Sequence, residues 1–182
     1  MRNNSTTHLL DRVAKDMGQQ CYEVPVGFKY ISAKMAETNA VIGGESSGGL
    51  AVRGHIAGKD GIYAAALLVE MLAVTGKSVS QLYQEITDKY GMLYYEDAAF
   101  TMTQARKVEL QEKLFVKLEV PDFGNAVEKI NRTDGCKVYF TDGSWVICRF
   151  SGTEPLLRMA AEGESQSQAR TYIRIWREEL GL

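Results

Sequence analysis

Residues 136–161 read CKVYFTDGSWVICRFSGTEPLLRMAA, and this stretch contains three apolar segments separated by two short polar turns. The first turn, residues 141–144, has Asp142-Gly143 at its centre, which is a strong signal for a β-hairpin. We therefore expect Cys136–Phe140 to pair with Trp145–Phe150, and residues 156–161 to form a third strand. Strands joined by short turns predict an antiparallel sheet in this half of the chain.

The second turn of this stretch carries the donors of an anion-binding loop. Ser151, Gly152 and Thr153 form the turn, and Arg149 and Arg158 flank it. Glycine lets the backbone bend so that N–H groups, two hydroxyls and two guanidinium groups can converge on one ligand. That set suits a phosphate monoester, because arginine forks match its oxygens and backbone amides bind anions well. The alternative is an ordinary hairpin loop with two solvated arginines, and the spacing alone leaves both open.

Helical and extended segments flank this stretch on both sides. A helix at 104–114, a strand at 115–120 and a helix at 123–131 are predicted before it, and a helix at 165–180 after it. Strands joined by hairpins and backed by helices predict a small α+β domain over residues 104–182. Residues 92–103 have no clear period, so we expect a linker or hinge there.

The first 91 residues alternate helix and strand signals, which predicts an α/β layer with a largely parallel sheet. A helix begins after Thr6 or Thr7 and is closed by Gly18, and a capping box at Ser78 and Gln81 begins another. The remaining expected elements are strands at 21–24 and 40–42, a helix at 30–37, and a helix at 61–75 that is apolar nearly all round and therefore expected to be well buried. The glycine-rich loop at 43–49 follows a strand, where ligands bind in such sheets.

Composition excludes several classes of partner. The chain has 182 residues, 45% of them apolar, with a net charge of -2, which gives no reason to expect nucleic acid or a membrane surface. Its three cysteines lack metal-ligand spacing, which favours a reducing, cytoplasmic location with all three in the core. The longest apolar run, residues 62–74, is interrupted by Glu70 and is too short to span a bilayer. The N-terminus has no signal-peptide pattern.

Two motifs in the two halves of the chain together resemble one enzyme family. Gly44-Glu45-Ser46-Ser47-Gly48, followed by Lys59-Asp60-Gly61 at the start of a helix, resembles the sugar-binding loop of the α-D-phosphohexomutases, which include phosphoglucomutases, phosphomannomutases and phosphoglucosamine mutases. Residues 149–158 resemble the phosphate-binding loop of that family's fourth domain. Residues 26–31 and Thr6-Thr7-His8 are similar to further segments of its third domain.

The resemblance covers the whole chain in the family's order, and it implies a domain organisation. The implied fold is an α/β/α sugar-binding domain at 1–91, a linker at 92–103 and a small α+β (TBP-like) phosphate-binding domain at 104–182. The chain would then be a C-terminal fragment containing domains 3 and 4, with the missing N-terminal domains of the same polypeptide as its partners.

The implied reaction interconverts hexose 1-phosphate and hexose 6-phosphate through a hexose 1,6-bisphosphate and an enzyme phosphoserine. The family's phosphoserine motif and its magnesium loop with three aspartates do not occur in this sequence. The resemblance therefore implies no catalytic or metal-binding residue here, Mg²⁺ only in the full-length enzyme, and a fragment that is inactive alone. The implied sugar-binding residues are Glu45, Ser47, Lys29 and His55, and the implied phosphate-binding residues are Arg149, Ser151, Gly152, Thr153 and Arg158.

Other interpretations stay open at this level. Glu45, Lys29 and Arg158 can each be read as a solvated surface charge, and His55 as a structural loop histidine. Gly49 stands where some bacterial members have a histidine, which leaves the substrate open between glucose, mannose and glucosamine phosphates. The alternatives are a phosphoglucosamine or acetylglucosamine mutase fragment, a non-catalytic sugar-phosphate-binding module, or an unrelated two-domain α/β protein.

Overall fold

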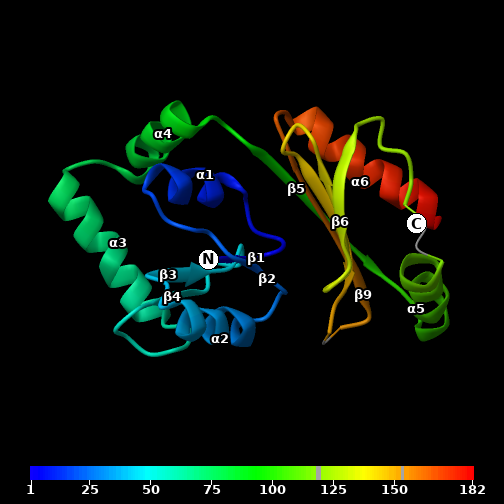
Figure 1. The fold of residues 1–182 in the computed structure, drawn as a ribbon, viewed down its shortest axis with the longest axis horizontal. Coiled ribbons are helices and arrows are strands. Elements are labelled where there is room, and N and C mark those ends of the chain that lie inside the picture. Colours follow the sequence, from blue (N-terminus) through cyan, green and yellow to red (C-terminus); the bar gives the residue numbers. More distant parts are fainter. Residues whose placement is uncertain (118–119, 153) are drawn as a thin grey trace. The chain divides into compact units, whose positions relative to one another are not determined.

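The computed structural model describes residues 1–117, 120–152 and 154–182, and the chain divides into two compact units, Met1–Met92 and Leu93–Leu182. Each unit has its own sheet and its own helices (Figure 1).

The first unit contains a four-stranded sheet in the order β2-β1-β3-β4. Its strands are short: β1 (Arg2–Asn3), β2 (Glu23–Val24), β3 (Ile42–Gly44) and β4 (Leu50–Val52). The central strand β1 runs parallel to β2 and β3, as the alternating pattern predicted, whereas β3 and β4 form an antiparallel hairpin. Strand β4 lies in a segment that the sequence suggested was a polar loop. The glycine-rich loop therefore lies at the tip of a hairpin.

Four helices complete the first unit: α1 (Leu9–Asp16), α2 (Phe28–Thr38), α3 (Gly61–Thr75) and α4 (Val79–Tyr90). The predicted capping box of α4 is confirmed: Ser78 Oγ accepts from the backbone N–H of Gln81, and the side-chain oxygen of Gln81 accepts from the backbone N–H of Ser78. Helix α3 ends at Gly76, which adopts a left-handed conformation (φ +66°). The start of α4 and the end of α3 thus follow local signals in the sequence.

The hydrophobic core of the first unit lies between α2 and the sheet. Met1, Val24 and Ile31 form its buried cluster. Gly43 makes the close approach possible, because a Cβ at that position would lie 2.6 Å from Cγ2 of Ile31. Helix α3 was expected to be well buried, and that prediction is wrong: none of its residues is buried. The helix is apolar on all sides, but only one side of it faces other residues of its own unit.

The second unit is a five-stranded antiparallel sheet in the order β5-β9-β8-β7-β6. Its strands are β5 (Tyr94–Thr101), β6 (Val127–Asn131), β7 (Cys136–Phe140), β8 (Trp145–Phe150) and β9 (Leu156–Gly163). The hairpin predicted around Asp142-Gly143 is confirmed, with Tyr139 opposite Trp145. Residues 92–103 are not a linker, because β5 pairs with β9 along its whole length.

The helices of the second unit are α5 (Gln104–Gln111), which continues as a π-helical turn η1 (Glu112–Val116), and α6 (Gln166–Leu180). Helix α6 packs against β5, β8 and β9. Buried residues of both helices, including Leu110, Leu114 and Trp176, join Phe140 and Leu157 of the sheet in one core. Two predicted elements are wrong here: the strand at 115–120 begins inside the π-helical turn, and the helix at 123–131 contains β6 instead.

Cys136 and Cys148 are buried in this core as free thiols, whereas Cys21 of the first unit is only half-buried. Burial raises the pKa of all three thiols above the ordinary value. Within the described residues, no single helix is long and apolar enough to span a membrane. Helices α3 and α4 have the necessary length and composition only when they are taken together, and an 81° bend separates them.

Candidate functional site

The loop between β3 and β4 is a hydrogen-bonded turn that carries two exposed serines and one buried carboxylate. The backbone N–H of Glu45 donates to the carbonyl of Gly49 (3.0 Å), and the N–H of Gly48 donates back to the carbonyl of Glu45 (2.9 Å). Gly48 has φ +88°, in the left-handed region that favours glycine. The turn leaves Ser46 and Ser47 exposed while the side chain of Glu45 is only 6% exposed. Two hydroxyls and one carboxylate thus lie at one hairpin tip.

Three donors hold the side chain of Glu45, one of the predicted sugar-binding residues. Its carboxylate accepts from Nζ of Lys59 (2.9 Å), the side-chain amide of Asn3 (3.3 Å) and the backbone N–H of Gly27 (3.2 Å). Burial favours the neutral acid, but these hydrogen bonds, led by the one from Lys59, outweigh it and hold the pKa of Glu45 below its ordinary value. The loop therefore presents a fixed, ionised carboxylate.

Lys59 belongs to this loop, although the sequence pointed to it only as part of a motif. Its side chain is 51% exposed, and its ammonium lies 2.9 Å from Glu45 and 5.3 Å from the ring centre of Phe28. Its methylene groups pass so close to Gly49 that a Cβ there would lie 2.8 Å from Cδ of Lys59. Gly49 thus leaves room for the lysine. In the sequence, the signal for this contact is a residue without a side chain, Gly49, ten positions before Lys59.

Lys29 and His55 have other partners, and among the described residues neither makes a hydrogen bond or ion pair with Glu45 or Ser47. Lys29 is exposed in the first turn of α2, with its ammonium 4.9 Å from the ring centre of Tyr30. His55 bonds to Asp60 (2.8 Å) and stacks on Tyr63 at 4.0 Å between ring centres. The backbone N–H of Tyr63 and the imidazole of His55 hold the pKa of Asp60 below its ordinary value, and Asp60 in turn caps α3. His55 therefore supports a helix start, which fits the structural interpretation.

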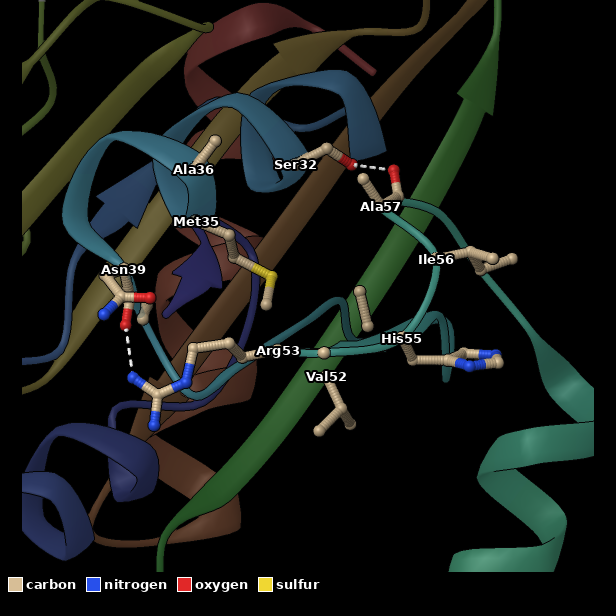
Figure 2. A pocket seen from close by; sticks show the side chains of 12 residues that line it. Ser32, Met35, Ala36, Asn39, Val52, Arg53, His55, Ile56 and Ala57 are labelled. Carbon is tan, nitrogen blue, oxygen red and sulfur yellow. Dashed lines mark hydrogen bonds between the residues drawn. The ribbon is translucent and has the colours of Figure 1, made fainter.

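A pocket of about 190 Å³ lies near His55, between α2 and the segment that follows β4 (Figure 2). Two of its polar side chains bond to the backbone: Oγ of Ser32 donates to the carbonyl of Ala57 (2.9 Å) and Nη1 of Arg53 to that of Asn39 (2.9 Å). Figure 2 shows the His55 imidazole pointing away from the Met35 and Ala36 side of the pocket. Neither Glu45 nor Ser47 lines it, so we do not assign the sugar site to this pocket.

The second candidate site is the turn between β8 and β9. The backbone N–H of Ser151 donates to the carbonyl of Leu156 (2.8 Å), and Oγ of Ser151 accepts from the backbone N–H of Glu154 (3.3 Å). The Ser151 hydroxyl keeps its own proton for a further acceptor. Gly152 is exposed, has an ordinary negative φ, and a Cβ there would meet nothing within 4 Å. Thr153 lies outside the described residues.

Arg149 and Arg158 flank this turn as directly opposite residues of β8 and β9. Like charges in opposite positions of a sheet repel, and each arginine is paired with a carboxylate. Arg149 Nε lies 3.3 Å from Asp134, and Arg158 Nη2 lies 2.7 Å from Glu154 in an exposed pair. Among the described residues, Arg149 has a partner only at Nε. The side chain of Arg149 is 13% exposed.

Within the described residues, no group of three or more His, Cys, Asp or Glu side chains lies close enough together to hold a metal ion.

The chain is similar to one family over both units. The family model described as phosphoglucomutase/phosphomannomutase, alpha/beta/alpha domain III, matches residues 1–90, and the model of that family's C-terminal domain matches residues 102–175. The chain is 35% identical to a phosphoglucomutase/phosphomannomutase of Thermococcus kodakarensis over 178 residues, which are 98% of this chain and 36% of that protein. It is 28% identical to phosphoglucomutase-1 of Bos taurus, covering 98% of this chain and 34% of the bovine protein.

Solved structures show the same similarity. The structure of pp63/parafusin, a Paramecium phosphoglucomutase in its open form, matches 99% of this chain and 36% of its own, with a TM-score of 0.72 and 25% identity. A phosphoglucomutase/phosphomannomutase family protein of Burkholderia thailandensis matches 98% of this chain and 36% of its own, with a TM-score of 0.75; at 23% identity it supports the fold alone. The chain therefore spans about a third of the length of the relatives it matches.

Proposed function

Because the chain belongs to the phosphoglucomutase/phosphomannomutase family and carries its domain III and C-terminal domain, we propose that it binds a hexose phosphate through two loops. The Glu45–Ser47 loop of the first unit binds sugar hydroxyls. The turn between β8 and β9 binds the phosphate group that is not being transferred. The ionised, hydrogen-bonded carboxylate of Glu45 beside the exposed Ser47 is the observation that carries this proposal.

The sugar side follows from the hydrogen-bonding capacity of the loop. A carboxylate with two oxygens has about four lone-pair positions, and Glu45 uses three of them for Lys59, Asn3 and Gly27. The remaining capacity accepts one hydroxyl, and Ser47 donates to or accepts from its neighbour. The half-exposed ammonium of Lys59 adds a donor within reach of the same hydroxyls. Lys29, in the first turn of the neighbouring helix, supplies positive charge to the ligand, and His55 stays a structural residue.

The phosphate side follows from three donors in and beside the β8–β9 turn. The terminal nitrogens of Arg149, the hydroxyl of Ser151 and the backbone N–H of Gly152 can each donate a hydrogen bond to a tetrahedral anion. Neither the conformation of Gly152 nor the packing around it requires glycine. Glycine at this position would let an anion approach the backbone closely. Arg158 joins when the anion displaces Glu154, since an exposed pair of this kind contributes less than about 1 kcal/mol; Thr153 is proposed from its position in the motif.

The chemical step belongs to the parts of the full-length relatives that this chain does not match. In the proposed reaction, phosphate would move between O1 and O6 of a hexose through a hexose 1,6-bisphosphate, and a phosphoserine and Mg²⁺ in those parts of the full-length enzyme would supply that chemistry. This chain orients the sugar and holds the other phosphate. We therefore expect no mutase turnover when the chain is mixed with Mg²⁺ and glucose 1-phosphate, and a clear rate would overturn that assignment.

Binding is tested by calorimetric titration of the chain with glucose 1,6-bisphosphate at fixed ionic strength. The two retained loops are only part of a binding surface, so we expect a dissociation constant on the order of millimolar. Arg149→Ala removes a charge-assisted hydrogen bond and should weaken binding about tenfold or more.

Arg174→Ala is the matched control, because Arg174 is an exposed helix arginine paired with Glu178. It removes the same charge and should leave the affinity unchanged. Equal weakening by both variants would show a general charge effect and contradict the assignment of the β8–β9 turn. Unchanged affinity of Arg149→Ala would contradict it as well.

A further inference from the structure

Two buried polar residues at the end of β1 make hydrogen bonds to the Glu45–Ser47 loop. Asn3, the last residue of β1, is 3% exposed, and Thr6 is 6% exposed. Strands β1 and β3 are parallel neighbours, so their carboxyl ends lie at the same edge of the sheet. The chain leaves β1 after Asn3 and leaves β3 into Glu45, which brings both polar residues beside the loop.

The contacts form a closed ring of hydrogen bonds. The backbone N–H of Ser46 donates to Oγ1 of Thr6 (3.0 Å), and the Thr6 hydroxyl donates to Oδ1 of Asn3 (2.8 Å). The side-chain amide of Asn3 then donates to Oε1 of Glu45 (3.3 Å). Because Glu45 and Ser46 are adjacent in the chain, the ring closes on itself. It fixes two consecutive loop residues, one through its side chain and the other through its backbone.

The neighbours of Asn3 determine which end of its amide faces the carboxylate. Oδ1 of Asn3 accepts from the Thr6 hydroxyl and from the backbone N–H of Ser5 (3.0 Å), so the amide nitrogen faces Glu45. Burial raises the pKa of Glu45, but the hydrogen bonds from Lys59 and Asn3 contribute to holding that pKa below its ordinary value. The orientation of Asn3 thus depends on Thr6, and the charge of Glu45 depends in part on Asn3.

We propose that Asn3 and Thr6 are positioning residues, which hold the Glu45 carboxylate and the backbone of Ser46 in the arrangement that binds sugar hydroxyls. This inference rests on the sugar-binding function proposed above and adds two residues that act through the loop. A loop that is fixed before the ligand arrives loses less conformational freedom on binding. The ring also gives a role to Thr6 of the Thr6-Thr7-His8 segment.

Thr6→Val removes the hydroxyl and keeps the branched shape, so the ring loses two of its hydrogen bonds. In amide NMR titrations of the 182-residue chain, followed at residues 44–49, glucose binding should weaken about fivefold, which is the equivalent of one neutral hydrogen bond. The carboxyl NMR resonance of Glu45 should show its pKa rising toward the ordinary value. Thr6→Ser keeps the hydroxyl and should restore both properties. Thr38→Val is the matched control, because the Thr38 hydroxyl bonds to a carbonyl of its own helix, and it should change neither.

Asn3→Asp tests the second positioning residue. A carboxylate at this position still accepts from Thr6 and Ser5, but its other oxygen faces Glu45 where the amide nitrogen was. Two carboxyl groups this close resist ionising together, so the pair should titrate with one apparent pKa above the ordinary range. Glucose binding at pH 7 should weaken at least about fivefold. Asn39→Asp adds the same charge at an exposed position of this unit and should leave the Glu45 pKa and the glucose affinity unchanged.

Far-UV circular dichroism checks that the variants fold, which is expected for Thr6→Val because the exposed Ser46 can bond to water. If glucose shifts no amide of residues 44–49 in the wild type, the sugar-binding function is wrong, and the positioning role with it. If the wild type binds glucose but Thr6→Val and Asn3→Asp leave its affinity or the Glu45 pKa unchanged, the positioning role alone is wrong. A matching change in Thr38→Val would also overturn it.

Discussion

Replacing Glu45 by glutamine removes the charge of the sugar-binding loop and keeps the side-chain shape. The carboxylate accepts three hydrogen bonds, from Lys59, Asn3 and Gly27. A glutamine can direct its carbonyl oxygen to Asn3 and Gly27, but its amide group then faces the ammonium of Lys59. The variant therefore weakens two contacts and loses the third.

The size of the effect follows from these contacts. A hydrogen bond to a charged group contributes roughly 1.5–3 kcal/mol, and a neutral one about 1 kcal/mol. The bonds from Asn3 and Gly27 are long, and Lys59 is half exposed, so its pair adds less than about 1 kcal/mol. The glutamine variant also avoids the cost of burying a charge. We expect the first unit to lose about 1–2 kcal/mol at pH 7.

The assay is native-state hydrogen exchange of the β3 and β4 amides as a function of pH, which reports the stability of the first unit alone. The folded pKa of Glu45 lies below its ordinary value of 4.5. An acid with a lowered pKa stabilises the fold above its unfolded pKa and loses that stabilisation as the pH falls through its folded pKa. The difference between wild type and Glu45→Gln should therefore be constant above about pH 5.5 and shrink below 4.5.

A difference that persists unchanged to pH 3, or that grows as the pH falls, would show that Glu45 is not ionised and held by these donors. Glu85→Gln is the control, because Glu85 is an exposed glutamate paired with an exposed lysine. Its stability difference should be near zero throughout.

Three further substitutions test other parts of the structure. Leu157→Ala, at a fully buried position, should cost the second unit about 2–5 kcal/mol in urea unfolding followed by tryptophan fluorescence. Ser78→Ala removes the cap of α4 and should cost about 1 kcal/mol, measured by amide exchange in that helix. Gly135→Ala places a Cβ at φ +88°, 2.5 Å from Cβ of Arg149, so it should cost about 1–3 kcal/mol and also weaken phosphate binding in a titration.

Elements with local signals could be predicted from the sequence. Asp142-Gly143 correctly predicted the hairpin of β7 and β8, and Ser78 with Gln81 correctly predicted the start of α4. The strand predicted at 115–120 was wrong because a short apolar run such as Leu114-Phe115-Val116 fits a buried helix as well as a strand. Strand β6 was read as a helix because it is mostly exposed and its pairing with β7 shifts between Val127 and Lys129, so it has no clear alternation.

The candidate site was only partly predictable for a related reason. Glu45 and Ser47 stand in a contiguous motif, which the sequence displays. The donors that hold Glu45 come from Asn3, Gly27 and Lys59, and their contacts depend on how β1, α2 and the hairpin come together. Likewise, the ion pairs of Arg149 with Asp134 and of Arg158 with Glu154 depend on the register of β8 and β9 and on the turn that contains Asp134. Neither pair is visible as a pattern in the sequence.

The most direct test of the central claim is one set of amide NMR titrations with glucose, inorganic phosphate and glucose 1-phosphate. The account predicts that glucose shifts the amides of residues 44–49 and that phosphate shifts those around Arg149 and Ser151. Glucose 1-phosphate should shift both groups. If phosphate leaves the β8–β9 turn unchanged, or if glucose 1-phosphate shifts neither loop, the division of sugar and phosphate binding between the two units is wrong.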